Sequence, residues 1–152
     1  MIYISHRGNV DGKSDMENNP AYIDFAIHIG YDVEVDVWSR KGEWFLGHDE
    51  PTHKIDLAWL EDRRSSLWCH AKNPDALKHL CGLNLHAFGH DKDKYICTSF
   101  GYVITHPNIK PVKSCVAMLP EQKGHDVTGC VAVCSDVVAA YEVRDCLCNT
   151  KK

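Results

Sequence analysis

Residues 32–37 read Asp-Val-Glu-Val-Asp-Val, an unbroken alternation of acidic residues and valine. Because successive side chains of a β-strand point to opposite faces, Glu34 and Asp36 share one face of the predicted strand and the valines share the other. Two carboxylates inside a fold repel each other and are costly to desolvate unless a cation neutralises them. The segment therefore predicts a divalent-metal site, with oxygen ligands that suit Mg2+ or Ca2+ best. The alternative is a solvated face of an exposed sheet.

Further short apolar runs, bounded by polar residues or glycine, have the length of strands. We expect strands at residues 2–5, 32–37, 44–47, 67–70, 85–89, 102–105, 114–119 and 129–134. Apolar residues at helical spacing predict helices over residues 20–29, 56–64 and 74–82. Asn19-Pro20 and Asn73-Pro74 are each typical of a helix start, because asparagine caps the first turn and proline suits the first helical position.

Strands and helices alternate in the first half of the chain, which is typical of a parallel sheet with right-handed crossovers. We expect a single α/β domain over residues 1–152, built as a miniaturised TIM-type (β/α) barrel with reduced helices in its second half. The chain has 152 residues, well below the roughly 250 of a typical barrel of this kind. From residue 85 onward the predicted strands follow one another too closely for full helices between them.

Polar residues stand at the ends of several predicted strands, as in His6-Arg7, Gly47-His48 and His70-Ala71-Lys72. In a parallel α/β fold the carboxyl ends of the strands meet at one mouth, where active sites form. Two imidazoles, those of His6 and His48, suit an acid and a base at neutral pH, in either assignment. Arg7 and Lys72 would hold phosphoryl oxygens through their positive charge. Four other polar residues that follow predicted strands either line the same mouth or are ordinary loop residues: His90, Asp91, Asp93 and His106.

Four short motifs occur in order along the first third of the chain. They are His6-Arg7-Gly8, Glu17-Asn18, Gly30-x-Asp32-x-Glu34-x-Asp36-Val37 and Gly47-His48-Asp49. This series resembles the glycerophosphodiester phosphodiesterase family, part of the superfamily of phosphatidylinositol-specific phospholipase C-like phosphodiesterases, of which the chain would be a compact, short member. The third motif is one residue shorter here than in that family.

The resemblance implies a role for each matching residue. By it, His6 and His48 would be the catalytic acid and base, Glu34 and Asp36 metal ligands, and Arg7 a phosphate contact. Glu17 would lie at the mouth of the site, near the metal or orienting Arg7. Ser135-Asp136 is similar to the end of the family's last strand.

The chain departs from the family at the strand after the E-x-D pattern. Such enzymes usually carry a third acidic metal ligand in a Glu-x-Lys pair, whereas here His70 stands two residues before Lys72. His70 would then be a metal ligand, with Glu121 as the alternative from a later strand. An imidazole ligand would favour Zn2+ or Mn2+ over Ca2+, so the metal stays open. Trp38 either contacts substrate or is an ordinary packed aromatic residue.

Charge and cysteine content limit the other functions. The formal net charge is -4, with no segment rich in Lys and Arg, so we expect no nucleic-acid partner. The N-terminus does not read as a secretory signal, and no stretch approaches the about 20 apolar residues of a membrane span. We therefore expect a soluble cytoplasmic protein with no transmembrane segment, whose eight cysteines are free thiols. The alternative for some of them is a zinc cluster of Cys130, Cys134, Cys146 and Cys148.

Together these features predict a metal-dependent hydrolase of a glycerophosphodiester or related alkyl phosphodiester, with a role in lipid metabolism. Its partner would be the small-molecule substrate, and the oligomeric state is open. Three other interpretations are kept. The first is a lyase-type enzyme in which the substrate's own hydroxyl attacks and a cyclic phosphate forms. The second is an inactive relative that binds a phosphorylated ligand or a metal, and the third is a zinc-stabilised interaction domain.

Overall fold

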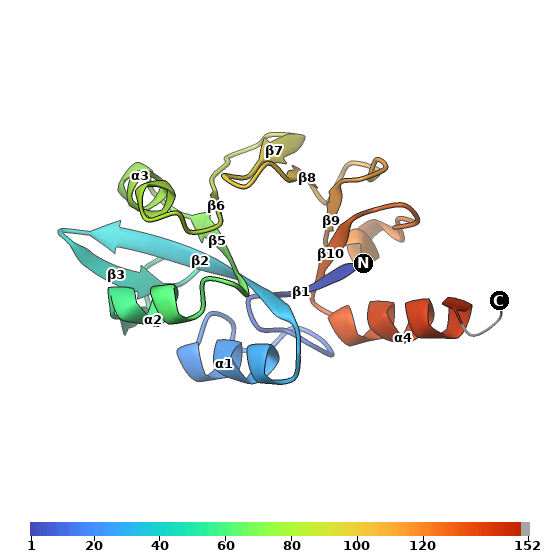
Figure 1. The fold of residues 1–152 in the computed structure, drawn as a ribbon, viewed down its shortest axis with the longest axis horizontal. Coiled ribbons are helices and arrows are strands. Elements are labelled where there is room, and N and C mark those ends of the chain that lie inside the picture. Colours follow the sequence, from blue (N-terminus) through green and yellow to red (C-terminus); the bar gives the residue numbers. More distant parts are fainter. Residues whose placement is uncertain (150–152) are drawn as a thin grey trace.

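The computed structural model describes residues 1–149, and in them ten strands form one mixed sheet (Figure 1). The strands are β1 (Ile2–His6), β2 (Asp32–Arg40), β3 (Glu43–Leu46), β4 (His53–Ile55), β5 (Leu67–Ala71), β6 (Ala87–Phe88), β7 (Tyr95–Cys97), β8 (Val103–Thr105), β9 (Val116–Met118) and β10 (Ala132–Ser135). The helices are α1 (Pro20–His28), α2 (Leu57–Asp62), α3 (Pro74–Gly82) and α4 (Val138–Asn149), with a short 3-10 helix, η1 (Pro120–Lys123). Each strand and helix expected from the sequence overlaps one of these elements.

The middle of the sheet is parallel, in the order β6-β5-β2-β1-β10-β9-β8. β7 pairs antiparallel with β8 at one end, and the β3-β4 hairpin adds antiparallel to β2. β2 serves both parts because it is nine residues long. Its first half pairs with β1 and β5, and its last residues pair with β3.

The expected TIM-type (β/α) barrel is wrong, because the sheet is not closed. Within residues 1–149 no ladder joins β6, at one end of the sheet, to β7 or β8 at the other end. β6 is only two residues long, too short to offer a ladder to a second neighbour. Single hydrogen bonds link it to the segment before β8 instead: Ser99 N–H donates to the Ala87 carbonyl at 2.7 Å, and Ala87 N–H donates to the Ser99 hydroxyl at 2.9 Å.

The helices do not alternate with the strands as they would in such a barrel. Between β6 and β10, a stretch that the structure describes throughout, the connections contain only η1. The helices instead cover the first half of the sheet, where α1 and α3 contact β2, while α4 packs beside β1 and β10 (Figure 1). The second half of the fold is therefore a succession of short strands and loops.

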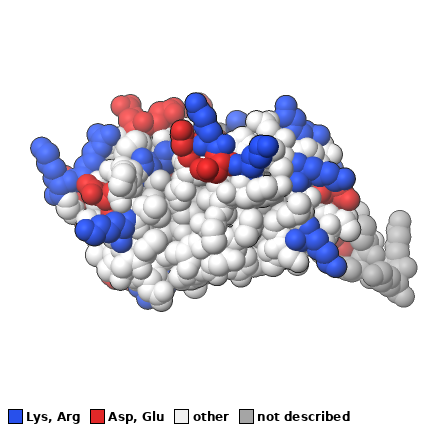
Figure 2. Space-filling view, turned by 90° about the horizontal axis from the view of Figure 1, so that it is seen from above, with Lys and Arg blue, Asp and Glu red and all other residues white. Residues whose placement is uncertain are grey.

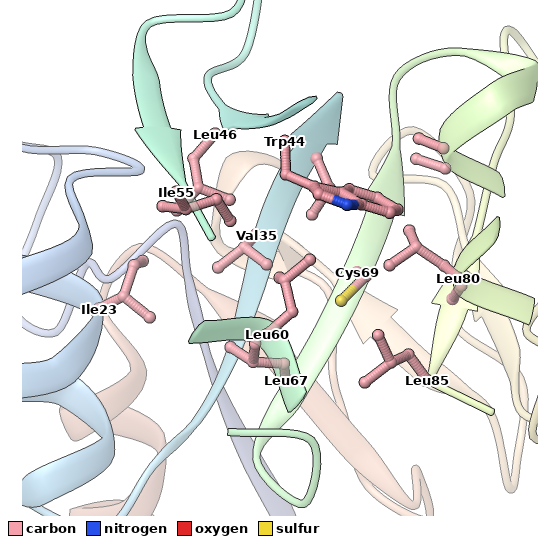
Figure 3. Packing of buried hydrophobic residues seen from close by; sticks show 14 of the residues in the cluster. Ile23, Val35, Trp44, Leu46, Ile55, Leu60, Leu67, Cys69, Leu80 and Leu85 are labelled. Atoms are coloured by element: carbon pink, nitrogen blue, oxygen red, sulfur yellow. The ribbon is translucent and has the colours of Figure 1, made fainter. Parts of the chain in front are cut away.

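One apolar cluster fills the space between the sheet and the helices of the first half. Val33, Val35 and Val37, the apolar half of the alternating segment, are fully buried in it. Figure 3 shows Val35 of β2 and Cys69 of β5 gathered with Leu60 of α2. The predicted alternation of this strand is thus confirmed, since its valines face the helices and its carboxylates face the other way.

A second apolar cluster, called the inner cluster below, lies on the opposite face of the sheet. It joins Trp68 and Phe88, from β5 and β6, to Ile104 and Val116, from β8 and β9. These strands stand near opposite ends of the strand order, so the open sheet curves until its inner face meets itself. Glu34 and Asp36 sit on this inner face, in register with Trp68 and His70.

The Asn-Pro helix starts are confirmed in detail. The Asn19 side chain accepts a hydrogen bond from Ala21 N–H, and the Asn73 side chain accepts one from Ala76 N–H. No helix in the described part of the chain combines the length and the apolar character that a membrane span needs.

Candidate active site

The parallel register brings the predicted site residues to one edge of the sheet. His6 at the end of β1 stands beside Glu34 on β2, and Asp36 on β2 stands beside His70 on β5. Asp136 directly follows β10, on the other side of β1. Residues far apart in the sequence meet here because all four strands run in the same direction.

Glu34, Asp36 and His70 form a compact group of possible metal ligands, with one ligand atom from each within 4.8 Å of the others. His70 Nδ1 lies 3.0 Å from Asp36 Oδ1 and 3.7 Å from Glu34 Oε1. Ligand atoms bound about 2.1 Å from one ion in a tetrahedral arrangement are about 3.4 Å apart, so these separations suit a shared cation. Glu34 Oε2 and Asp36 Oδ1 are buried and form no hydrogen bond among the described residues. The donor set therefore fits a divalent metal ion.

The two carboxylates have different electrostatic surroundings. Burial and the neighbouring Asp36 raise the pKa of Glu34, which is 2% exposed. Burial acts in the same direction on Asp36, but His48, His70 and Arg7 around it keep the pKa of Asp36 well below its usual range. Glu34 is thus the carboxylate that gains most from an added cation, and Asp36 already has cationic neighbours.

Nitrogen-bearing side chains surround Asp36. Arg7 Nε lies 2.9 Å from Oδ2, as an ion pair without hydrogen-bond geometry, and Lys72 Nζ lies 3.4 Å from Oδ1. His48 Nδ1 lies 3.1 Å from Oδ2 and 2.6 Å from Arg7 Nη2. The Asn18 side chain donates to Oδ2 at 2.9 Å and accepts from the Asp36 backbone N–H at 2.9 Å. Arg7, His48 and Lys72 are therefore held together at one carboxylate.

The carboxylate of Asp136, which lies 130 residues further along the chain, orients His6. His6 Nδ1 lies 2.7 Å from Asp136 Oδ1, and the Asn9 amide donates to the same oxygen at 2.8 Å. Burial lowers the pKa of His6, but Asp136 and the nearby Glu34 outweigh it and raise the pKa overall. Because Asp136 accepts the Nδ1–H, Nε2 is the nitrogen left for chemistry, 3.8 Å from Glu34 Oε2.

The backbone around Arg7 is strained. Arg7 and Asn18 both have positive φ, 56° and 61°, and Asn18 N–H donates to the Arg7 carbonyl at 3.1 Å. Gly8 follows with φ 93°, and a Cβ there would lie 2.6 Å from a ring carbon of Tyr22. Such conformations cost of order 1–3 kcal/mol each and cluster at functional sites. The His-Arg-Gly sequence is thus explained by a tight turn that aims Arg7 at Asp36.

A pocket of about 150 Å3 opens beside these groups. Its lining residues are His6, Arg7, Glu34, His48, His70, Phe88, His90, His106, Pro107, Met118 and Leu119. Since one water occupies about 30 Å3 in the liquid, the pocket has room for a phosphoryl-sized group and a few neighbouring atoms. A lipid-sized molecule would have to extend out of it.

The structure brings most of the predicted site residues together. His6, Arg7, Glu34, His48 and His70 line the pocket, and Lys72 lies at Asp36. Glu17 lies behind Arg7 and accepts from Nη1 at 3.0 Å, which matches the orienting role named as one of its two alternatives. Of the polar residues expected at the mouth, His90 and His106 line the pocket, whereas Asp91 and Asp93 are not among its lining residues.

Glu121 and Trp38 lie away from the metal-ligand group. Glu121 Oε1 accepts from the Asp136 backbone N–H at 2.9 Å, so it supports the turn that carries Asp136. The Trp38 indole donates to the Gly47 carbonyl at 2.7 Å, next to His48, and stacks under Arg40. Each therefore supports a loop beside the pocket rather than lining it.

The zinc cluster kept as the alternative for Cys130, Cys134, Cys146 and Cys148 has no counterpart in the described side chains. Cys130 instead lies beside Cys115, with 3.8 Å between the sulfurs, and Cys134 is buried in the inner cluster. The side chain of Cys148 lies outside the described part of the chain. Among the described residues, Glu34, Asp36 and His70 are the group that could hold a metal ion.

Sequence reasoning missed several groups that shape the site. Asp136 and Asn18 appeared in the motifs without a role, and Asn9, which bonds both Asp136 and Glu17, was not noticed. The apolar wall of Phe88, Met118 and Leu119 was also missed. A His paired with a distant Asp leaves no local signal in the sequence. Asn18, in contrast, belongs to the Glu17-Asn18 motif, and this motif could have assigned it to the site.

No protein-family model matches this sequence, and no curated protein or solved structure matches it either. The resemblance to glycerophosphodiester phosphodiesterases therefore stays an interpretation of the short motifs.

The charged side chains show no dominant sign on the face drawn in Figure 2. Lys and Arg side chains lie there among Asp and Glu side chains along the upper edge and at both ends, and the lower middle of the face is largely uncharged. Nucleic-acid backbones bind continuous basic surfaces, and this face offers none. The absence of a nucleic-acid partner stays a prediction.

Proposed function

We propose that this protein is a metal-dependent phosphodiesterase that hydrolyses small glycerophosphodiesters or related alkyl phosphodiesters. The observation that supports it most is the composition of one small pocket. Two imidazoles, His6 and His48, line it together with Arg7 and two of the three possible metal ligands, and Asp36, the third, pairs with Arg7. Acid, base, anion-binding and metal-binding groups thus lie within reach of one phosphoryl-sized volume.

Substrate binding would depend on the cationic residues around Asp36. Arg7 has a planar guanidinium that can bond two phosphoryl oxygens, and Glu17 holds it in place by the bond to Nη1. Lys72, two residues beyond His70 and 16% exposed, would add a second charge to the same oxygens. A divalent ion held by Glu34, Asp36 and His70 would polarise the phosphoryl group as a Lewis acid.

The two histidines would move the protons. Asp136 fixes Nδ1–H of His6, so His6 exchanges a proton at Nε2, inside the pocket. His48 is 43% exposed in its side chain and lies at the solvent side of Arg7, so it can exchange a proton with water or a leaving alcohol. One histidine would take the proton from the attacking water, and the other would protonate the leaving alkoxide.

The test is turnover of glycerophosphocholine and of bis(p-nitrophenyl) phosphate, with and without EDTA. Wild-type protein is compared with His6→Ala and Glu34→Gln, and with the exposed His28→Ala as a matched control. We expect EDTA-sensitive activity that falls about 100-fold or more in His6→Ala and Glu34→Gln and is unchanged in His28→Ala. Equal turnover in all four proteins would refute the site.

The same reaction separates hydrolysis from the cyclising route. If a neighbouring hydroxyl of the substrate attacks, phosphorus NMR shows a cyclic phosphate before the monoester. We expect the monoester directly.

The compartment belongs to this proposal as well. The described cysteines are free thiols, several of them buried, which suits the reducing cytoplasm.

A further inference from the structure

The ring of His70 packs against two other rings, Phe88 and His90, which lie 6.4 Å from each other and nearly parallel. Phe88 stacks on it with 5.0 Å between ring centroids and 6° between planes, and His90 stacks on it at 4.7 Å and 9°. Phe88 is 1% exposed, so its ring is fixed by the inner cluster. The imidazole therefore rests on a fixed aromatic surface, which limits its rotation on that side.

This orientation aims Nδ1 of His70 at both carboxylates, at 3.0 Å from Asp36 Oδ1 and 3.7 Å from Glu34 Oε1. Both carboxylates have a buried oxygen that forms no hydrogen bond with the described part of the chain. The ligand set is thus one nitrogen and two carboxylates, with the pocket on the open side, where Glu34 and His70 form part of the wall. Catalytic zinc sites commonly have three protein ligands and one open position.

We propose that His70, positioned by its packing against Phe88 and His90, makes this centre select Zn2+ and Co2+, and less strongly Mn2+, over Mg2+ and Ca2+. The inference rests on the metal site of the proposed function but not on hydrolysis. Mg2+ and Ca2+ are hard ions that take oxygen ligands, whereas imidazole suits borderline transition metals. Two carboxylates alone would leave the choice to the hard ions, and the nitrogen changes it.

His90 is a positioning residue in this account. It is not one of the three grouped ligands, and it contacts the centre through the His70 ring. Residues that orient a metal ligand typically change metal affinity about 10–100-fold when removed. His90→Ala removes the stack, whereas His90→Phe keeps an aromatic ring without a nitrogen. His106→Ala is the matched control, since His106 lines the same pocket and lies edge-on to His90 at 6.4 Å.

The experiment measures metal affinity of the EDTA-treated full chain by calorimetry and follows the visible spectrum of the Co2+ complex. We expect Zn2+ to bind at least about 100-fold more tightly than Mg2+ or Ca2+, in line with the preference of nitrogen ligands. His70→Glu should reduce the ratio of Zn2+ to Mg2+ affinity at least about tenfold. His90→Ala should weaken Zn2+ binding about 10–100-fold, and His90→Phe should restore it.

Thiols also bind Zn2+ and Co2+, so sulfur ligation must be distinguished. A thiolate ligand to Co2+ gives a strong near-ultraviolet charge-transfer band, and we expect none from this centre. The spectrum should change in His70→Glu and stay the same in His106→Ala.

Three results would overturn the inference: equal affinity for Mg2+ or Ca2+, a ratio that His70→Glu leaves unchanged, or no ion bound at one equivalent. Wild-type selectivity decides the first and third results even if a variant fails to fold. Tight, His70-dependent Zn2+ binding without phosphodiester hydrolysis would uphold this inference and refute the proposed function.

Discussion

Replacing Glu34 by glutamine should stabilise the metal-free protein. Glu34 is 2% exposed, and its Oε2 forms no hydrogen bond with any residue that the structure describes. The ligand atoms of Glu34 and Asp36 lie within 4.8 Å of each other. Two unit charges about 5 Å apart at an effective dielectric constant of about 20 repel by about 3 kcal/mol. His6 and His70, at 3.8 Å and 3.7 Å, offset part of this repulsion. We therefore expect a net gain of about 1–2 kcal/mol, or about 3–6 °C in Tm for a domain of this size.

The gain should depend on pH with a definite sign. A carboxyl whose pKa is raised on folding binds its proton more tightly in the folded state, so its contribution to stability is present below the unfolded pKa and is lost as pH rises. Metal-free wild-type protein should therefore lose stability between pH 5 and pH 8 relative to Glu34→Gln. Urea unfolding at both values, after EDTA treatment, measures the difference.

Added metal should remove the advantage of Glu34→Gln over wild type. An ion at 100 times its Kd stabilises the folded state by about 2.7 kcal/mol, and Glu34→Gln should gain less than about 1 kcal/mol from the same ion. The exposed Glu50→Gln is the matched control and should behave as wild type throughout. Metal-free Glu34→Gln that is less stable than wild type, or that keeps the full gain from metal, would refute the reasoning.

Three further predictions concern other parts of the fold. Asp136→Asn should lower kcat about 100-fold or more with little change in KM, because His6 loses the acceptor that fixes its Nδ1–H. Steady-state kinetics on bis(p-nitrophenyl) phosphate measures both constants, and an unchanged kcat would contradict this role of Asp136. Burial lowers the pKa of His86 to about 4, so the unfolded chain binds this proton more tightly than the folded protein does. The free energy of unfolding should therefore fall by about 2 kcal/mol as pH falls from about 6.5 toward 4. His86→Gln should remove that part of the pH dependence in urea titrations, and a curve parallel to wild type would count against it. Leu80→Ala should cost about 3 kcal/mol of unfolding free energy, because Leu80 is fully buried in the apolar cluster between the sheet and the helices. A loss below about 1 kcal/mol would mean that this cluster is loosely packed there.

Local features of the sequence predicted the elements well. The alternation at residues 32–37 placed β2 and its two faces correctly, because one face meets the helices and the other meets the inner cluster. The Asn-Pro pairs gave the starts of α1 and α3, since asparagine capping depends only on the next few residues. α4 was missed, although Val138 and Tyr141 stand at helical spacing and are buried.

Closure of the sheet could not be read from the same features. Whether a barrel closes depends on the length of the strands at the seam, and residues 85–89 read as a full strand whereas only Ala87–Phe88 pairs. The candidate site shows the same limit. Glu34 and Asp36 follow from local period, but the His6 to Asp136 pair depends on β1 lying next to β10, which no local pattern specifies.

The most direct test of the account is the number of metal equivalents that restores activity to EDTA-treated protein. We predict that phosphodiesterase activity is absent without metal and returns fully at one equivalent of divalent ion per chain, in wild type but not in Asp36→Asn. Full activity of the metal-free protein, or equal recovery in Asp36→Asn, would contradict a metal-dependent phosphodiesterase built on Glu34, Asp36 and His70.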